Sequence, residues 1–336
     1  MKRGLVVLDP AEVSEAERTG RVLRLQRRLA AEGVTIALDY ADVHRSDDLA
    51  YLTNLCLYWN EGILAVPVVG EPTFLMKLSP RVHPWMRRSS TLTDLRSGKG
   101  FTALVEGLLG GLEPGVLGLV DAALCPATAV EEVRAAAPGW EIRPLGGLVR
   151  EQRLVPSAAE RALLRDAQAH LEAGLDAVSA TGGSDGERIA LVEQALRGAG
   201  FTDVFAEVVH GPDGVAAVDV TGQYRFCWVR AARLVGPNPP WARELDRALA
   251  AAVAAVAPGV AASAPVTAAE EVLAGLPAGA VASATVVHQA DLSTGGDYAD
   301  PAEPVPAGAV VVVGVEVLFP DGGRVAVTET VPVEAS

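Results

Sequence analysis

The chain has 336 residues, half of them hydrophobic, and carries a net charge of −14 at pH 7. This length suits about two domains with a substantial core. The negative charge disfavours nucleic acid and anionic membrane as partners, because both are bound by basic surfaces.

Hydrophobic patterning and cysteine usage indicate the compartment. No uninterrupted apolar run approaches the length of about 20 residues that crosses a bilayer. The N-terminal segment meets Asp9 and Pro10 before an apolar stretch of signal-peptide length forms. The three cysteines, Cys56, Cys125 and Cys227, are widely spaced and odd in number, which suits a reducing compartment and disfavours a thiolate zinc site. We therefore expect a cytoplasmic protein.

Strands and helices alternate along the first part of the chain. Apolar side chains recur at helical spacing over residues 17–32, and Gly33 follows as a C-terminal cap. Residues 47–55 are expected to form an exposed turn or a short helix. The remaining elements are helices over residues 101–110 and 127–137 and strands over residues 34–39, 62–69, 73–76 and 116–121. This alternation predicts an α/β domain over residues 1–147.

The second part of the chain begins with a capping signal. Ser157 and Glu160 have the spacing of a capping box, which opens a helix that extends to about Ala180. Further helices are expected over residues 187–197 and 239–256, and strands over residues 310–317 and 324–333. Paired helices around a hairpinned sheet predict an α+β domain over residues 148–336.

Residues 218–236 predict a β-hairpin that carries one acid and one base. Two β-rich runs flank a turn at Thr221 and Gly222. Asp219 lies near the start of the hairpin, and Arg230 lies in its second arm. The role of this pair is the main question that the sequence raises.

Five segments occur in the order in which they occur in a known family. They are residues 51–54 (YLTN), 66–72 (VPVVGEP), 148–160 (LVREQRLVPSAAE), 305–310 (VPAGAV) and 322–333 (GGRVAVTETVPV). With these segments the chain resembles the family of creatinase, prolidases, X-Pro aminopeptidases and methionine aminopeptidases over nearly its whole length. The resemblance implies an α/β creatinase-like N-terminal domain and an α+β C-terminal domain with the pita-bread fold.

The resemblance also implies a degenerate metal site. Metal-dependent members of the family hold two divalent ions with an Asp, a second Asp on the same hairpin, a His and two Glu. The matching positions in this sequence are Asp219, Arg230, His288, Gly314 and Thr328. Arg233 supports this register, because the family keeps an Arg three residues after the second Asp. Glu316 lies two residues from Gly314, on the same face of the expected strand.

A guanidinium at the second ligand position is hard to reconcile with divalent ions, because it repels both of them. We therefore expect no metal and no other cofactor. Arg230 is instead expected to pair with Asp219 and to hold a substrate carboxylate. A salt bridge that only preserves the fold after loss of the metal is the alternative for this pair.

The other candidate site residues follow from the resemblance. His288 is the candidate for proton transfer, with Asp219 and Glu316 completing the catalytic set; a buried structural His is the alternative. His210 resembles a substrate-facing His of the family. Tyr58 and Trp59 lie in a loop that, in creatinase-like dimers, reaches the partner's active site, although an ordinary core or interface role is equally open. Tyr298 lies in a glycine-rich loop, residues 293–298, that is expected to line the pocket.

Three functions remain open from the sequence. The first is a metal-independent, creatinase-like hydrolase, or a related lyase or cyclising enzyme, that acts on a carbon–nitrogen bond of a small polar metabolite. The resemblance supports it, because creatinase cleaves such a bond without metal. The second is an inactive interaction or scaffold protein, and the third is an X-Pro metallopeptidase with altered ligands. The expected partners are a small-molecule substrate and a second copy of the chain, whose N-terminal domain completes the active site.

Overall fold

The computed structural model describes residues 8–180, 183–274, 276, 279–294 and 302–334. Contacts divide the chain into two compact units, one of which ends at Arg153 while the other continues from Leu154. Residues 148–153, which we assigned to the second domain, form helix α6 (Leu148–Arg153) and belong to the first unit.

A mixed six-stranded sheet forms the centre of the first unit, with strand order β4-β3-β2-β1-β5-β6. Strands β1, β5 and β6 are parallel, whereas β2 runs antiparallel to both of its neighbours. The strands are β1 (Ile36–Asp42), β2 (Glu61–Pro67), β3 (Thr73–Met76), β4 (Asp94–Ser97), β5 (Val116–Val120) and β6 (Glu141–Leu145). The expected α/β domain is thus present.

Helices cover both faces of this sheet. Leu25, Leu29 and Leu52 belong to a hydrophobic core on one face, and Phe101 and Val133 belong to the core on the other. The α-helices that precede α6 are α1 (Glu15–Ala31), α2 (Asp47–Thr53), α3 (His83–Ser89), α4 (Phe101–Leu109) and α5 (Ala127–Ala136). The expectation of an exposed segment at α2 was wrong, because all but one of its residues are buried.

The second unit contains a second sheet of six strands, with order β10-β11-β12-β9-β8-β7. Every neighbouring pair in it is antiparallel. The strands are β7 (Asp203–His210), β8 (Ala216–Tyr224), β9 (Cys227–Val235), β10 (Val281–His288), β11 (Val310–Leu318) and β12 (Arg324–Pro332).

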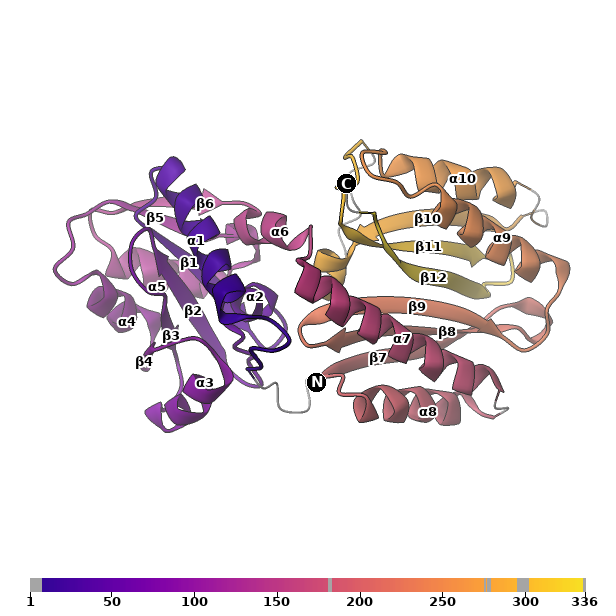
Figure 1. Ribbon diagram of the computed structural model, residues 1–336, viewed down its shortest axis with the longest axis horizontal. Helices are drawn as coiled ribbons and strands as arrows, with labels where there is room; N and C mark the ends of the chain where they lie inside the picture. Colours follow the sequence, from indigo (N-terminus) through magenta and orange to yellow (C-terminus); the bar gives the residue numbers. More distant parts are fainter. Residues whose placement is uncertain (1–7, 181–182, 275, 277–278, 295–301, 335–336) are drawn as a thin grey trace. The chain divides into compact units, whose positions relative to one another are not determined.

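The α-helices of the second unit lie together on one face of this sheet, as Figure 1 shows. Helix α7 packs on β9, and α9 and α10 pack on β10, β11 and β12. The helices are α7 (Ala158–Ala180), α8 (Asp185–Gly198), α9 (Pro240–Ala254) and α10 (Ser263–Leu273). The capping box at the start of α7 is confirmed by reciprocal hydrogen bonds between Ser157 and Glu160, at 2.9 and 3.1 Å. These helices do not cover the opposite face of the sheet.

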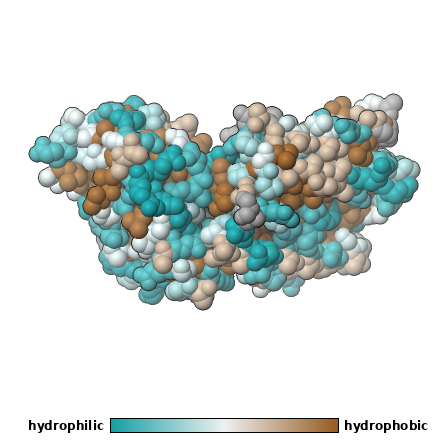
Figure 2. Space-filling model, turned by 45° about the horizontal axis from the view of Figure 1, so that its top comes forward, coloured by the Kyte–Doolittle hydropathy of each residue, from teal (hydrophilic) through white to brown (hydrophobic). Residues whose placement is uncertain are grey.

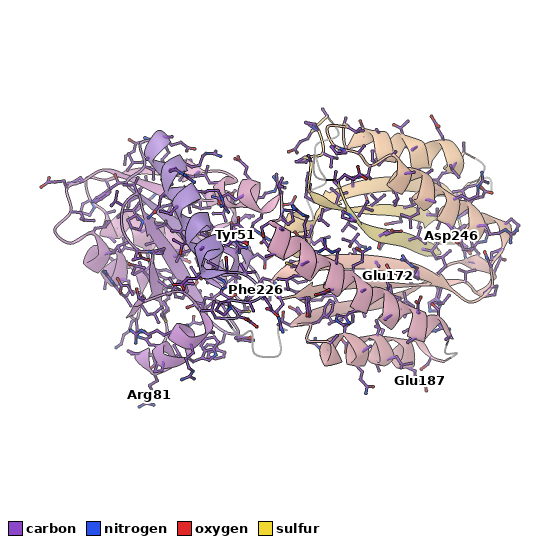
Figure 3. The ribbon with its side chains drawn as sticks, viewed as in Figure 1. Tyr51, Arg81, Glu172, Glu187, Phe226 and Asp246 are labelled. Atoms are coloured by element: carbon purple, nitrogen blue, oxygen red, sulfur yellow. The ribbon has the colours of Figure 1, made fainter. Side chains whose placement is uncertain are left out.

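The turn between β8 and β9 lies further along the chain than the sequence suggested. Thr221 and Gly222 are inside β8, and Arg225 and Phe226 form the turn with positive φ angles of 49° and 69°. Positive φ at both central residues is the backbone of a type I′ turn, whose twist matches that of a hairpin. Phe226 marks this turn in Figure 3.

Hydrophilic side chains spread over the visible face of both units, with hydrophobic ones in scattered patches (Figure 2). Among the described residues, no helix is both long and apolar enough to cross a membrane.

Candidate functional site

A pocket of about 310 Å³ lies on the face of the second sheet that the helices leave uncovered. Each of the six strands contributes at least one lining residue, and these include Phe205, Thr221, Arg230, Thr285, Gly314 and Thr328. Strand register explains why they meet. Phe205, Thr221 and Arg230 are directly opposite one another across β7, β8 and β9, and Thr285, Gly314 and Thr328 form a second such row across β10, β11 and β12. Residues opposite one another in a sheet share a face.

Asp219 and Arg230 form a bidentate ion pair at this face. Arg230 donates from Nε to Oδ1 of Asp219 at 3.0 Å and from Nη2 to Oδ2 at 2.5 Å. The side chain of Asp219 is 7% exposed and that of Arg230 is 33% exposed. These hydrogen bonds raise the pKa of Arg230 above its usual value, so the guanidinium remains charged. The acid and the base that the sequence places on this hairpin are therefore in direct contact.

Arg230 is also fixed through its backbone. Oγ1 of Thr330 accepts a hydrogen bond from the Arg230 amide at 3.0 Å and donates one to the Arg230 carbonyl at 2.8 Å. The ladder between β9 and β12 has a single paired position, Thr328 with Ala232. The Thr330 hydroxyl thus joins two strands beside the pocket and holds Arg230 in place.

The neighbouring hairpin repeats this arrangement with Glu316 and Arg324. Arg324 donates from Nε and Nη2 to the two carboxylate oxygens of Glu316, at 2.7 and 3.0 Å. Both residues line the pocket, and both are more exposed than Asp219, at 39% for Glu316 and 51% for Arg324. The hydrogen bonds that Arg324 donates to Glu316 raise the pKa of Arg324, and the charge of Glu316 also contributes to the raised pKa of Arg230. The two ion pairs are therefore close enough for the charge of one to affect the other.

Thr328 brings an unsatisfied polar atom to the pocket. Its side chain is only 3% exposed, and its Oγ1 has no hydrogen-bond partner among the described residues. Gly314, directly opposite, keeps this row open, because a Cβ there would lie 3.0 Å from Oγ1 of Thr285 and 3.2 Å from Cγ2 of Thr328. A buried hydroxyl without a partner costs free energy, which a ligand or water that bonds to it recovers.

The side chains at the positions that match the family's metal ligands do not fit a dinuclear metal centre. Asp219 is the one carboxylate among them, and both of its oxygens accept from Arg230. Gly314 and Thr328 stand where the resemblance implies two Glu. Within the described part of the chain, no cluster of three or more His, Cys, Asp or Glu side chains is arranged to hold a metal ion.

His288 is not brought to the pocket. Its neighbour Val287 lines the pocket, so the two-residue period of a strand directs His288 to the other face. There it is paired with Val311, a member of the core beneath α9, and it is 1% exposed. The structure therefore separates the expected proton-transfer residue from Asp219 and Arg230.

His210 also lies away from the pocket. It is paired with Ala216 at the end of β7, and its Nε2 is 2.8 Å from Oδ2 of Asp185 on α8. Since α8 belongs to the helical layer, this contact places His210 on the helix-covered side of the sheet. The substrate-binding role expected from the resemblance has no support from this position.

Two further expected residues belong to the first unit. Tyr58 and Trp59 form an aromatic cluster with Trp85, with ring centroids 5.7 to 6.1 Å apart. Tyr298 lies outside the described residues.

Arg233, which supported the alignment of the hairpin, acts on the helical face. It donates to both carboxylate oxygens of Glu172 on α7 at 2.7 Å and to the carbonyl of Thr328 at 3.0 Å. Glu172 is labelled on α7 in Figure 3. Arg233 therefore joins α7 to the sheet while Arg230, three residues earlier, faces the pocket.

The sequence reasoning missed Phe205, Thr221, Thr285 and Arg324. Phe205 and the two threonines follow from register alone, because they lie directly opposite positions already singled out. Arg324 had a local signal. It is eight residues from Glu316 across a Pro-Asp-Gly-Gly turn, which is a spacing that places an acid and a base side by side in a hairpin.

Comparisons with known proteins agree on the fold. No protein-family model matches the sequence, and no curated protein matches it. Among solved structures, a prolidase from Pyrococcus horikoshii is 15% identical with a TM-score of 0.76, covering 94% of this chain and 95% of its own. An X-Pro aminopeptidase from Thermotoga maritima is 16% identical with a TM-score of 0.77, at coverages of 94% and 95%. The dipeptidase PepE from Mycobacterium ulcerans is 22% identical with a TM-score of 0.71, at coverages of 95% and 94%.

These likenesses extend over both units, and they confirm the fold that the resemblance implied. The chain has the fold of the creatinase, prolidase and X-Pro aminopeptidase family, with a pita-bread second domain.

Proposed function

We propose that the second domain binds a small polar molecule in this pocket without a divalent metal. The observation that carries the proposal is the guanidinium of Arg230, held by Asp219 at 2.5 and 3.0 Å and lining a pocket of about 310 Å³. An arginine is not deprotonated in proteins, so this position keeps its positive charge. Arg324 supplies a second fixed positive charge to the same pocket.

The volume and the lining of the pocket support binding of a ligand. The pocket has a volume at the lower end of the range for small-molecule sites, which is roughly 300–1,000 Å³. Its lining combines hydroxyl and charged groups with apolar side chains such as Val287 and Leu292. The buried Oγ1 of Thr328 offers a hydrogen bond that the described residues do not use.

Binding ranks above hydrolysis in this proposal because, among the described residues, neither Asp219 nor His288 is placed to act as a base in the pocket. A general base needs a free acceptor within about 2.6–3.2 Å of the proton that it removes. Both oxygens of Asp219 accept from Arg230, and His288 faces the helical side of the sheet. Cleavage of a carbon–nitrogen bond is the second candidate. It is favoured by Glu316, a carboxylate that lines the pocket and is more exposed than Asp219.

A ligand screen with a blocked pocket tests the proposal. We would screen the full chain in EDTA against small polar metabolites by ligand-observed NMR, and repeat the screen with Gly314→Val, whose added methyl groups enter the space between Thr285 and Thr328. Gly186→Val is the matched control, because nothing lies within 4 Å of a Cβ at Gly186. We expect ligands that bind the wild type and the control but not Gly314→Val. Ligands that bind only with an added divalent ion would refute metal-independent binding.

The same samples separate binding from catalysis. If the second candidate is correct, a bound ligand is converted over hours and its NMR signals are replaced by those of products. Loss of this turnover in Glu316→Gln, with binding retained, would assign the chemistry to Glu316.

A further inference from the structure

The charged groups of the pocket have donors to spare. Arg230 and Arg324 each use Nε and Nη2 to bind their own carboxylate, and in the described ranges neither uses Nη1 in a hydrogen bond. The hydroxyl of Thr328 is a third donor without a partner there. All three residues line the pocket.

The acceptors of the pocket are more fully used than the donors. Both oxygens of Asp219 accept from Arg230, and both oxygens of Glu316 accept from Arg324. Since each of these oxygens already accepts from a guanidinium, a ligand group that brings acceptors complements the three donors named above. A carboxylate does so best, because its two oxygens match the parallel N–H groups of guanidinium.

The surrounding charge disfavours a ligand that carries more than one negative charge. Glu207 on β7 adds a third carboxylate, whose charge contributes to the raised pKa of both Arg230 and Arg324. Three carboxylates around two guanidiniums leave the cluster one negative charge in excess. This excess charge repels a phosphate or a dicarboxylate more strongly than a monocarboxylate, so a monocarboxylate is the anion that the cluster opposes least.

One wall of the pocket is apolar. Phe205 lines the pocket and remains 55% exposed, although it stacks on the buried ring of Trp228 with centroids 6.2 Å apart and planes 18° apart. Val287 and Leu292 also line the pocket. An exposed aromatic ring that a buried neighbour holds in place is suited to contact the apolar part of a ligand.

Building on the metal-free binding site proposed above, we infer that the ligand is a small monocarboxylic acid with an apolar body. Its carboxylate accepts hydrogen bonds from Nη1 of Arg230 and Arg324 and from the hydroxyl of Thr328. Its body lies against Phe205 and Leu292. The two guanidiniums thus bind the carboxylate together.

Three compounds with one body and different head groups test this inference. We would measure the affinities of 3-phenylpropionate, 3-phenylpropionamide and 3-phenylpropylamine for the full chain in EDTA by calorimetry. A hydrogen bond to a charged group is stronger than one between neutral groups, so we expect the carboxylate to bind about tenfold or more tightly than the amide, and the amine to bind most weakly.

Variants assign this preference to the named residues. Arg324→Gln should weaken 3-phenylpropionate about tenfold and leave the amide within about twofold, since only the carboxylate gains from the charge. Phe205→Ala should weaken all three compounds to a similar extent. Arg247→Gln is the matched control, because Arg247 forms an exposed pair with Glu244 on α9 and should change nothing.

The outcomes distinguish this inference from the proposed function. Tightest binding of the amine, or an unchanged carboxylate preference in Arg324→Gln, would overturn the ligand class while the pocket stands. The ligand class would also be overturned if none of the three compounds binds while other ligands bind the wild type and are excluded by Gly314→Val. If neither the three compounds nor any ligand of the wider screen binds without a divalent ion, the proposed function itself is refuted.

Discussion

Replacement of Arg230 by Met should destabilise the second domain by about 3 kcal/mol. Removal of one partner from a buried ion pair costs about 3–5 kcal/mol, because the other charge remains buried and unpaired. Asp219 is 7% exposed, whereas Arg230 is 33% exposed, which places the expected cost at the lower end. Methionine keeps most of the apolar stem of arginine, so the loss reports the charge rather than the packing.

The neighbouring hairpin provides the control. Arg324 and Glu316 form the same bidentate contact, but they are 51% and 39% exposed. Exposed pairs contribute about 0.2–1 kcal/mol. Arg324→Met should therefore cost less than about 1 kcal/mol, and the double variant Asp219→Asn with Arg230→Met should recover most of the loss.

Urea unfolding, together with hydrogen exchange measured by mass spectrometry, provides the assay. Two domains can unfold in separate transitions, so exchange in peptides from β8 and β9 identifies the domain that is affected. A loss of about 3 kcal/mol corresponds to a decrease in melting temperature of roughly 6–12 °C for a domain of this size. A change below about 1 kcal/mol in Arg230→Met, equal to that in Arg324→Met, would show that Asp219 is solvated and that the reasoning from burial is wrong.

Three further predictions concern positions outside the pocket. Burial raises the pKa of Asp39 well above its usual value, so the stability that its protonated form contributes is fully present below pH about 4 and is lost as the pH rises through the folded-state pKa. Asp39→Asn should therefore stabilise the protein at pH 7 but not at pH 3. An equal effect at both pH values in urea unfolding would contradict this. Gly62→Ala should cost about 3 kcal/mol, since its Cβ would lie 2.2 Å from the ring of Phe74; a normal melting temperature would refute the expected clash. His210→Ala should change stability by less than about 0.5 kcal/mol and leave ligand affinity unchanged, because its contact with Asp185 is exposed; loss of affinity in calorimetry would return His210 to the site.

The second sheet shows which parts of the site could be predicted from sequence. The hairpin with Asp219 and Arg230 was predictable, because its two arms are β-rich and close together in the chain. Its turn was misplaced from Arg225 and Phe226 to Thr221-Gly222, since glycine is the usual turn signal and two non-glycine residues with positive φ are rare. The glycine instead makes room for the ring of Phe201, which would lie 2.6 Å from a Cβ at Gly222.

His288 shows where the sequence reasoning reached its limit. The resemblance placed it at a ligand position, but a shift of one residue along a strand exchanges the two faces of the sheet. Val287 faces the pocket, and His288 faces the core beneath α9. When two sequences have low similarity, their alignment is easily displaced by one residue. The burial pattern of β10 decides which face of the sheet His288 occupies.

The sequence by itself determined the two-domain fold, the capping box that opens α7, and the placement of Asp219 and Arg230 on one hairpin. These depend on local periodicity and on residues close together in the chain. Only the tertiary structure decided which side chains share the pocket. Thr330 bonds to Arg230 from 100 residues away, and Thr285, Gly314 and Thr328 meet through strand register. Register is set by the packing of the whole sheet against its helices, and no short stretch of sequence contains that information.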